Sequence, residues 1–130
     1  IQGTAADLIK KAMVEIDAEA IKRVLINLID NGLAALANKA NGLITLTTQD
    51  RNEHIRLMIS DNGHGIPKEH FHRIFEPHFS TKSTGMGLGL AIVKNILDEQ
   101  KAEISVDSVE NFGTTFTIDF KKKFSIFNEN

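Results

Sequence analysis

Residues 55–65 read Ile-Arg-Leu-Met-Ile-Ser-Asp-Asn-Gly-His-Gly, an alternating segment that ends in a carboxylate and two glycines. Successive side chains of a β-strand point to opposite faces, so the apolar residues Ile55, Leu57 and Ile59 would share one face of a sheet. Asp61 continues the same face at the end of the strand. Because an unpaired buried charge is costly, we expect this inward carboxylate to need a hydrogen-bond donor.

The glycines that follow the strand, Gly63 and Gly65, would let a flat ligand lie close to the backbone. The exocyclic amino group of adenine is a donor that would satisfy Asp61. A second interpretation is that Asp61 only caps the following turn, because Asp-Asn-Gly is common in turns. From this segment alone, both interpretations stay open.

The periodicity of the apolar residues predicts a succession of helices and strands along the chain. Helices are expected at residues 4–14, 17–38, 67–76 and 88–100, and strands at residues 43–48, 55–61, 103–108 and 114–120. The strands form two hairpins with helices between them, and this order predicts an α+β fold. We expect a two-layer sandwich in which helices cover one face of a mixed, mainly antiparallel sheet.

The longest predicted helix begins after Asp17, whose side chain is a suitable N-cap. Its core stripe would consist of Ile21, Val24, Leu25, Leu28, Gly32 and Leu36. The chain then divides into an N-terminal helical segment at residues 1–16, one domain at residues 17–121 and a polar tail at residues 122–130.

The composition excludes several classes of protein. The 130 residues are 42% hydrophobic and 25% charged, which suits one domain with a sizeable core. The net charge of −2 supplies no global basic field, which argues against contact with nucleic acid or an anionic membrane. The absence of cysteine excludes disulfides, thiolate metal ligands and thiol nucleophiles. No apolar run is long enough to span a bilayer, and no signal peptide is recognisable.

A glycine-rich segment, Gly85-Met-Gly-Leu-Gly89, lies at the start of the helix predicted at residues 88–100. Backbone N–H groups at the start of a helix attract phosphate, and Lys82 lies just upstream. The common phosphate motifs do not fit: the sequence lacks G-x-x-x-x-G-K-[ST], and Leu90 stands where a dinucleotide fingerprint has its third glycine. A flexible loop without a ligand is the alternative.

Asn27 and Asn31 are four residues apart on the long helix, so both amides would project from one side, at the edge of the apolar stripe. Amide oxygens are suitable ligands for Mg²⁺, which takes few protein ligands together with substrate phosphates. The alternative is two ordinary polar residues on a solvated helix face.

Thr114 has the same parity as Phe116, Ile118 and Phe120 in the last predicted strand, which places its hydroxyl on the buried face. This hydroxyl would reinforce Asp61 directly or through a water molecule. An ordinary strand threonine is the alternative.

Taken in order, these features resemble the catalytic domain of bacterial sensor histidine kinases, in a superfamily that includes gyrase-type ATPases, heat-shock chaperones and mismatch-repair ATPases. The resemblance extends from about Asp17 to Lys121 and implies the Bergerat-type ATP-binding fold. It rests on five sequence boxes in the order of that family: Asn27-Leu-Ile-Asp-Asn31, Asp61-Asn-Gly-His-Gly65, Ile74-Phe-Glu-Pro-His-Phe79, Gly85 to Leu90, and Gly113-Thr-Thr-Phe116.

The resemblance implies a role for each candidate residue. Asn31, helped by Asn27, would hold Mg²⁺, and Asp61 would bind the amino group of adenine. Asn27, Asn31 and Lys82 would form the catalytic group. The other nucleotide contacts would come from Gly63, Gly65, Ile66 and Thr114 at the base and from Lys82, Gly85, Gly87, Leu88 and Gly89 at the phosphates.

The segment between Phe75 and Gly85 would be the lid over ATP, and it is short here. Its Ser80-Thr-Lys82 sequence resembles the nitrogen-regulatory type of sensor kinase. Many members of the family carry a basic residue three positions after the magnesium asparagine, whereas this chain has Ala34. Affinity for the triphosphate would then depend more on the lid.

The resemblance implies transfer of the γ-phosphoryl group of ATP, with little hydrolysis. Asn27 stands where gyrase-type ATPases carry the glutamate that activates water, and an amide cannot act as a general base. The acceptor would be a histidine on a dimerisation domain outside this chain, followed by a response regulator of a two-component system. None of the five histidines here has the usual sequence context of that acceptor. The family also implies a cytoplasmic location.

Two other functions stay open, namely a serine or other protein kinase of the same superfamily and a non-enzymatic scaffold. Residues 1–14 are unusual for a kinase domain and resemble a helix of family A DNA polymerases, without any polymerase catalytic carboxylate. A coincidence, a fusion or an engineered chimera would explain them. This segment would replace the usual first strand, pack on the sheet, or join two copies of the chain through residues 1–16 as a homodimer.

Overall fold

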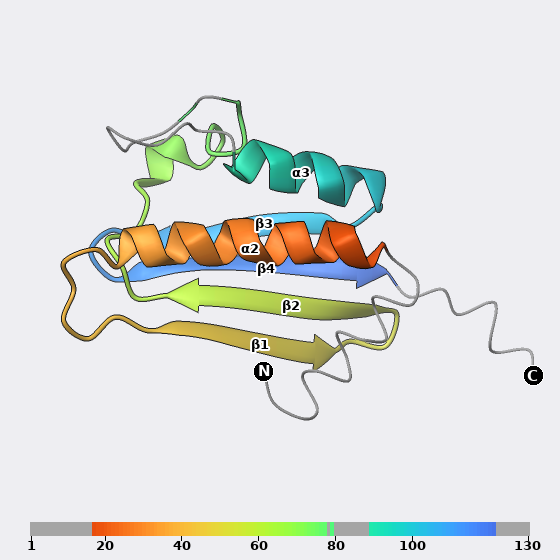
Figure 1. Ribbon diagram of the computed structural model, residues 1–130, viewed down its shortest axis with the longest axis horizontal. Coiled ribbons are helices and arrows are strands. Elements are labelled where there is room, and N and C mark those ends of the chain that lie inside the picture. Colours follow the sequence, from red (N-terminus) through yellow and green to blue (C-terminus); the bar gives the residue numbers. More distant parts are fainter. Residues whose placement is uncertain (1–16, 78, 80–88, 122–130) are drawn as a thin grey trace, which may run out of the picture.

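In the described part of the chain, a four-stranded sheet forms one layer of the fold and the helices α2 and α3 form the other (Figure 1). The computed structural model describes residues 17–77, 79 and 89–121. The predicted helix at residues 4–14 and the tail at residues 122–130 lie outside the described residues. The described elements follow in the order α2 (Ala18–Ala35), β1 (Ile44–Asp50), β2 (His54–Asp61), the 3₁₀-helix η1 (Lys68–His70), α3 (Gly89–Glu99), β3 (Glu103–Val109) and β4 (Gly113–Lys121).

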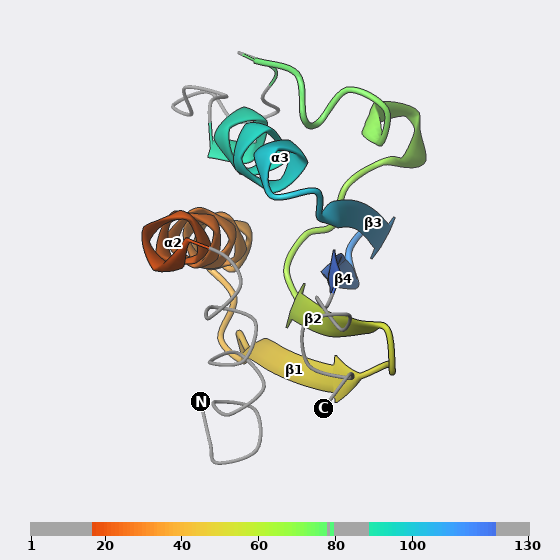
Figure 2. The same ribbon diagram turned by 90° about the vertical axis from the view of Figure 1, so that its right-hand side faces the viewer.

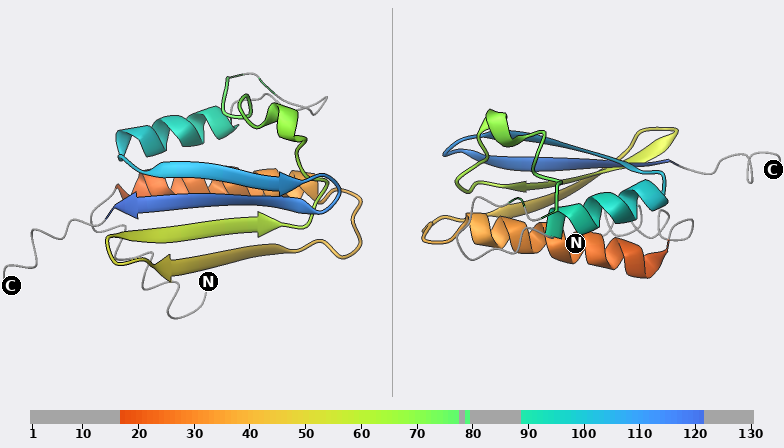
Figure 3. Two further views of the ribbon diagram at one scale, coloured as in Figure 1. Left: turned by 180° about the vertical axis from the view of Figure 1, so that it is seen from behind. Right: turned by 90° about the horizontal axis from the view of Figure 1, so that it is seen from above.

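The strands lie in the order β1-β2-β4-β3, so each predicted hairpin forms and β2 pairs with β4 at the centre of the sheet. All three pairings between described strands are antiparallel. Both helices cover the same face of the sheet (Figure 2), and the views from behind and from above show the same two layers (Figure 3). The predicted α+β sandwich is confirmed.

Helix α2 begins where its sequence predicts. The Asp17 side chain caps it by accepting a hydrogen bond of 3.0 Å from the backbone N–H of Glu19. The predicted core stripe is buried at Ile21, Val24, Leu28 and Gly32 and half-buried at Leu25 and Leu36. The helix ends at Ala35, earlier than expected. Its Ala35 carbonyl instead accepts a 3.2 Å hydrogen bond from His64 N–H in the loop after β2.

The prediction of an α-helix at residues 67–76 is wrong. The structure has only the 3₁₀-helix η1 there, followed by turns. Hydrogen bonds that span three residues, such as His70 N–H to the Pro67 carbonyl and Glu76 N–H to the Arg73 carbonyl, replace the four-residue bonds of an α-helix. This tighter path still buries Ile74, which is 5% exposed. Apolar spacing alone did not distinguish the two kinds of helix.

The core lies between the sheet and the two helices. Its most deeply buried side chains are Val24, Leu28, Val93, Leu97 and Ile118. They come from α2, α3 and the central strand β4. Burial of each of these aliphatic side chains stabilises the packing of the two layers by about 1.5–3 kcal/mol. Neither described helix combines the length and the apolar character that a membrane span requires.

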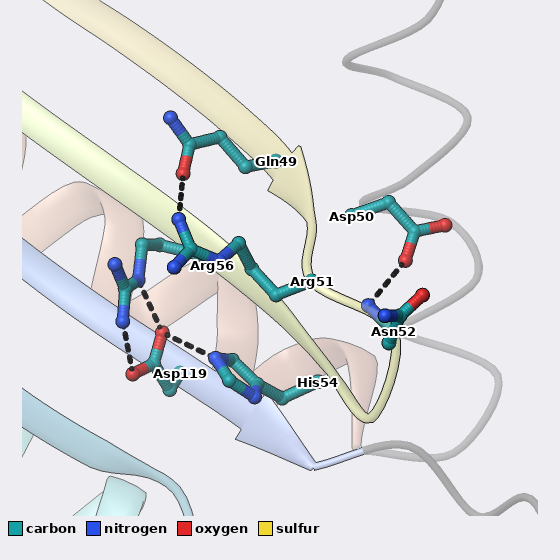
Figure 4. Close-up of polar contacts among 7 residues, drawn as sticks. All are labelled: Gln49, Asp50, Arg51, Asn52, His54, Arg56 and Asp119. Atoms are coloured by element: carbon teal, nitrogen blue, oxygen red, sulfur yellow. Dashed lines mark hydrogen bonds and ion pairs between the residues drawn. The ribbon is translucent and has the colours of Figure 1, made fainter.

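An ion-pair cluster lies on the face of the sheet opposite the two described helices (Figure 4). Arg56 of β2 donates hydrogen bonds of 2.8 and 3.1 Å to the two carboxylate oxygens of Asp119 on β4, its cross-strand partner. Nε2 of His54 lies 3.5 Å from the same carboxylate. The Arg56 hydrogen bonds lower the pKa of Asp119 below its usual value, against the opposing effect of burial.

Replacing Asp119 by Asn should destabilise the fold in a pH-dependent way. The folded-state pKa of Asp119 is lowered, so the stabilisation is complete above the unfolded-state pKa of about 3.9 and is lost as the pH falls through the folded-state pKa. Urea unfolding of the wild type and Asp119→Asn should therefore give free energies that converge below about pH 4. Asp98→Asn, in the exposed Lys94–Asp98 pair, is the control and should cost at most about 0.5 kcal/mol. A difference that grows in acid would contradict this assignment.

Candidate nucleotide-binding site

Three polar side chains lie next to one another in the last cross-strand row of the sheet on its helix-covered face, a row that Ile44 of β1 completes. Asp61 of β2 pairs with Thr114 of β4, and Thr114 pairs with Ser108 of β3. The row before it, Ile59–Phe116–Val106, is apolar and packs in the core. The polar row therefore closes the hydrophobic core at the end of the sheet where β2 and β3 finish.

The Asp61 carboxylate is half-buried and faces the layer of α2, as its strand parity predicted. A β-carbon placed on Gly32 of α2 would lie 3.7 Å from Cβ of Asp61. Oδ1 accepts a 2.9 Å hydrogen bond from Gly63 N–H, so the carboxylate does cap the following turn. Oδ2 accepts no hydrogen bond from the part of the chain that the structure describes. The turn cap is thus present, and it leaves the second oxygen without a partner among the described residues, so the two interpretations of Asp61 are compatible.

The two glycines after β2 pack against the protein's own backbone. A β-carbon on Gly63 would lie 2.4 Å from the carbonyl oxygen of Ala35, at the end of α2. Gly65 has a φ of +76°, and a β-carbon there would lie 2.3 Å from the carbonyl oxygen of Val109. Only glycine fits at these positions, because any side chain would separate the loop from α2 and from the β3–β4 turn.

The Thr114 hydroxyl, which the sequence placed near Asp61 for a direct or water-mediated contact, forms a hydrogen bond with Ser108. The two hydroxyl oxygens lie 2.8 Å apart, and both residues are 5% exposed. Ser108 also accepts a 2.8 Å hydrogen bond from the backbone N–H of Ile66, which is half-buried against the core. A direct hydrogen bond from Thr114 to Asp61 is not among those of the described residues.

Sequence reasoning missed Ser108, although a signal was present. Ile104, Val106 and Ser108 share one parity in β3, so Ser108 is a polar residue on a buried strand face. The same pattern singled out Asp61 in β2. Alternation could therefore have found both residues.

Asn27 of α2 lies near the start of α3, and Asn31 lies one helical turn closer to Asp61. Both Asn27 and Asn31 are half-buried, and a β-carbon on Gly89, the first residue of α3, would lie 3.7 Å from Oδ1 of Asn27. Asn31 follows one turn later and directly precedes Gly32, which lies against Asp61. Neither amide has a hydrogen bond to another described residue. Both amides are therefore available to a cation, and the alternative of two ordinary polar residues on a helix face stays open.

The structure brings part of the predicted site together. Asp61, Gly63, Gly65, Ile66 and Thr114 gather around the polar row, and Asn27 approaches Gly89 at the start of α3. The start of a helix directs backbone N–H groups outward, and such groups attract phosphate; α3 starts at Gly89 in the described part of the chain. The remaining predicted residues lie outside the described part of the chain: Lys82, Gly85, Gly87 and Leu88.

Comparison with known proteins decides the family. Residues 16–123 match the family described as histidine kinase-, DNA gyrase B- and HSP90-like ATPases. The chain belongs to this family. The predicted resemblance to a histidine kinase ATP-binding domain is confirmed, and use of ATP follows from it.

Curated relatives of this histidine kinase-type domain are longer proteins. The sensor histidine kinase ZraS of Escherichia coli K12 is 35% identical over 105 residues, which cover 81% of this chain and 22% of ZraS. Sporulation kinase A of Bacillus subtilis 168 is 37% identical over 107 residues, which cover 82% of this chain and 17% of that kinase. The chain thus spans about a fifth of the curated relatives that it matches.

Solved structures of the same family have the same fold. The catalytic domain of histidine kinase ThkA aligns with a TM-score of 0.71 and 38% identity, over 82% of this chain and 69% of that chain. The mycobacterial sensor histidine kinase MprB aligns with a TM-score of 0.73 and 28% identity, over 81% of this chain and 74% of that chain.

Proposed function

We propose that this domain binds ATP with Mg²⁺ and donates the γ-phosphoryl group to a histidine on a dimerisation domain, as the catalytic part of a cytoplasmic two-component kinase. The half-buried Asp61 carboxylate carries the proposal, because its Oδ2 accepts no hydrogen bond from a described residue and Asp61 lies against α2. On α2, the amides of Asn27 and Asn31 also lack a hydrogen bond to any described residue. A serine kinase and a non-enzymatic scaffold are the alternatives, and each predicts a different result for nucleotide binding or for the phosphorylated product.

Each group in the site has a chemical task in this proposal. Asp61 would accept a hydrogen bond from the adenine amino group through its open oxygen. Asn27 and Asn31 would hold Mg²⁺, which neutralises phosphate charge when it is bound. Gly89 and the N–H groups that follow it at the start of α3 would receive the phosphates. Lys82 and the glycines before α3 would contribute to the same end of the nucleotide.

Phosphoryl transfer fits these residues better than hydrolysis. Water attack needs a general base near the γ-phosphate, and the amides of Asn27 and Asn31 cannot accept a proton at neutral pH. Positioning and charge neutralisation are what phosphoryl transfer to an external nucleophile requires. The relatives ZraS and sporulation kinase A are named as kinases, which supports phosphoryl transfer over hydrolysis. A response regulator would then receive the phosphoryl group.

The first test is whether the chain binds the nucleotide. A non-hydrolysable ATP analogue at about 100 times its Kd should stabilise the fold by about 2.7 kcal/mol through mass action, seen as a raised Tm. EDTA should reduce the shift because the amides then lack their cation. An unchanged Tm with and without Mg²⁺ would favour the scaffold function.

The second test identifies the acceptor. The chain, mixed with radiolabelled ATP and a separately produced dimerisation domain that carries the acceptor histidine, should label that domain with an acid-labile, base-stable phosphoryl group. The dimerisation domain with its acceptor histidine replaced by Gln is the control. Acid-stable label on a protein substrate would favour a serine kinase.

A further inference from the structure

Ser108 and Thr114 are the buried polar residues of the described chain, and they lie side by side next to Asp61. Their hydroxyl oxygens are 2.8 Å apart, so one hydroxyl donates to the other. Which one donates determines what Thr114 can offer a ligand. The neighbours of Ser108 settle this direction.

A serine hydroxyl has one hydrogen to donate and two lone pairs to accept. Ser108 Oγ lies 2.8 Å from the carbonyl oxygen of Gly113, which has no hydrogen, so Ser108 must donate there. One lone pair of Ser108 accepts the N–H of Ile66 at 2.8 Å. The remaining lone pair faces Thr114, and Thr114 must therefore donate its own hydrogen to Ser108.

Thr114 is left with lone pairs only. Its cross-strand neighbour Asp61 is a carboxylate and also only accepts. Side chains of directly paired residues in adjacent strands lie about 4.5–5.5 Å apart at Cβ, so one ligand edge can meet both. This wall of the site therefore presents acceptors alone.

We propose that Ser108 is a positioning residue that sets the base preference of the site. Because Ser108 accepts the hydrogen bond that Thr114 donates, the Asp61–Thr114 wall presents acceptors to the ligand. Such a wall suits a base with an amino group at the facing edge and disfavours a base with a carbonyl group there. The inference rests on the proposed binding of ATP. It concerns how the site rejects a 6-oxopurine such as hypoxanthine.

Ser108→Ala tests the inference through a ratio of affinities. Without the Ser108 hydroxyl, the Thr114 hydroxyl can rotate and donate to a 6-carbonyl group, so the site discriminates less against a 6-oxopurine. The ratio of Kd for inosine triphosphate to Kd for ATP, measured by calorimetry with Mg²⁺, should fall by about tenfold, the worth of one matched hydrogen bond. If Ser108 had a purely structural role, its loss would lower the affinity for both nucleotides equally. An unchanged ratio of Kd values would therefore overturn the inference.

Two further variants act as controls for Ser108→Ala. Ser105→Ala changes an exposed serine of the same strand and should leave the ratio unchanged. Ser108→Thr keeps the hydroxyl, so its ratio of Kd values should stay within about twofold of the wild-type ratio. A changed ratio in Ser105→Ala, or a ratio in Ser108→Thr as low as that of Ser108→Ala, would overturn the assignment to the Ser108 hydroxyl.

Thr114→Val keeps the test decisive if Ser108→Ala does not fold. Valine has a similar size but no lone pairs, so ATP should lose more affinity than inosine triphosphate and the ratio should again fall. An unchanged ratio in Thr114→Val would overturn the inference by itself. A wild-type chain that binds ATP without preference would refute only the role of Ser108. A wild-type chain that binds neither nucleotide would refute the proposed function itself.

Discussion

Replacing Asp61 by Asn should lower the affinity for ATP and Mg²⁺ by about 100-fold and leave the fold intact. Asparagine keeps an oxygen that can accept the Gly63 N–H, so the turn after β2 is preserved. Its second position becomes an NH₂ donor, which would face the amino group of adenine in place of an acceptor. Calorimetric titration with a non-hydrolysable analogue measures the loss, and the unliganded Tm checks the fold.

Asp119→Asn is the matched control for this substitution. It makes the same chemical change, but Asp119 lies on the face of the sheet opposite the described helices and pairs with Arg56. Nucleotide affinity should therefore stay within about twofold of the wild type. If Asp61→Asn bound ATP as tightly as the wild type, Asp61 would not bind the adenine amino group, and the main argument for the proposed function would be lost.

Replacing Gly63 by Ala should cost the fold about 3 kcal/mol of its free energy of unfolding and weaken nucleotide binding as well. The new methyl group would meet the carbonyl oxygen of Ala35 at 2.4 Å, and backbone atoms cannot rotate away as a side chain can. The loop would have to move off the end of α2 and would carry Asp61 with it. Urea unfolding measures the loss of stability.

Gly42→Ala is the comparison for this loss. The nearest atoms to a β-carbon at Gly42 are those of the Leu36 side chain, from 3.1 Å, and this side chain can shift. The change in free energy there should stay below about 1 kcal/mol. If Gly63→Ala proved as mild as Gly42→Ala, the close packing of the loop against α2 would be wrong.

The sequence predicted the site wherever the signal was local. Alternation in β2 placed Ile55, Leu57 and Ile59 inside, and these residues are 4%, 2% and 3% exposed. Asp61 then follows on the same face, half-buried. Side-chain alternation is a property of the strand backbone itself, so no knowledge of the partner strands was needed.

Local signals failed where burial by distant segments decided the backbone. The apolar spacing of Phe71, Ile74 and Phe75 predicted an α-helix, but the chain forms η1 and turns that bury Ile74. The glycines at 63 and 65 predicted space for a ligand, and the structure shows that they also allow close contact with Ala35 and Val109. Neither outcome is encoded in the spacing of neighbouring residues.

The amino-acid sequence alone determined the α+β class, the cap and core face of α2, and the inward direction of Asp61, because helix and strand periodicities act over a few neighbouring residues. Only the tertiary structure decided which groups meet at the end of the sheet. Ser108 contacts the N–H of Ile66, 42 positions away in sequence, and its place beside Thr114 depends on the register of β3 and β4. Register and long-range packing are set by the whole core at once, and no local pattern specifies them.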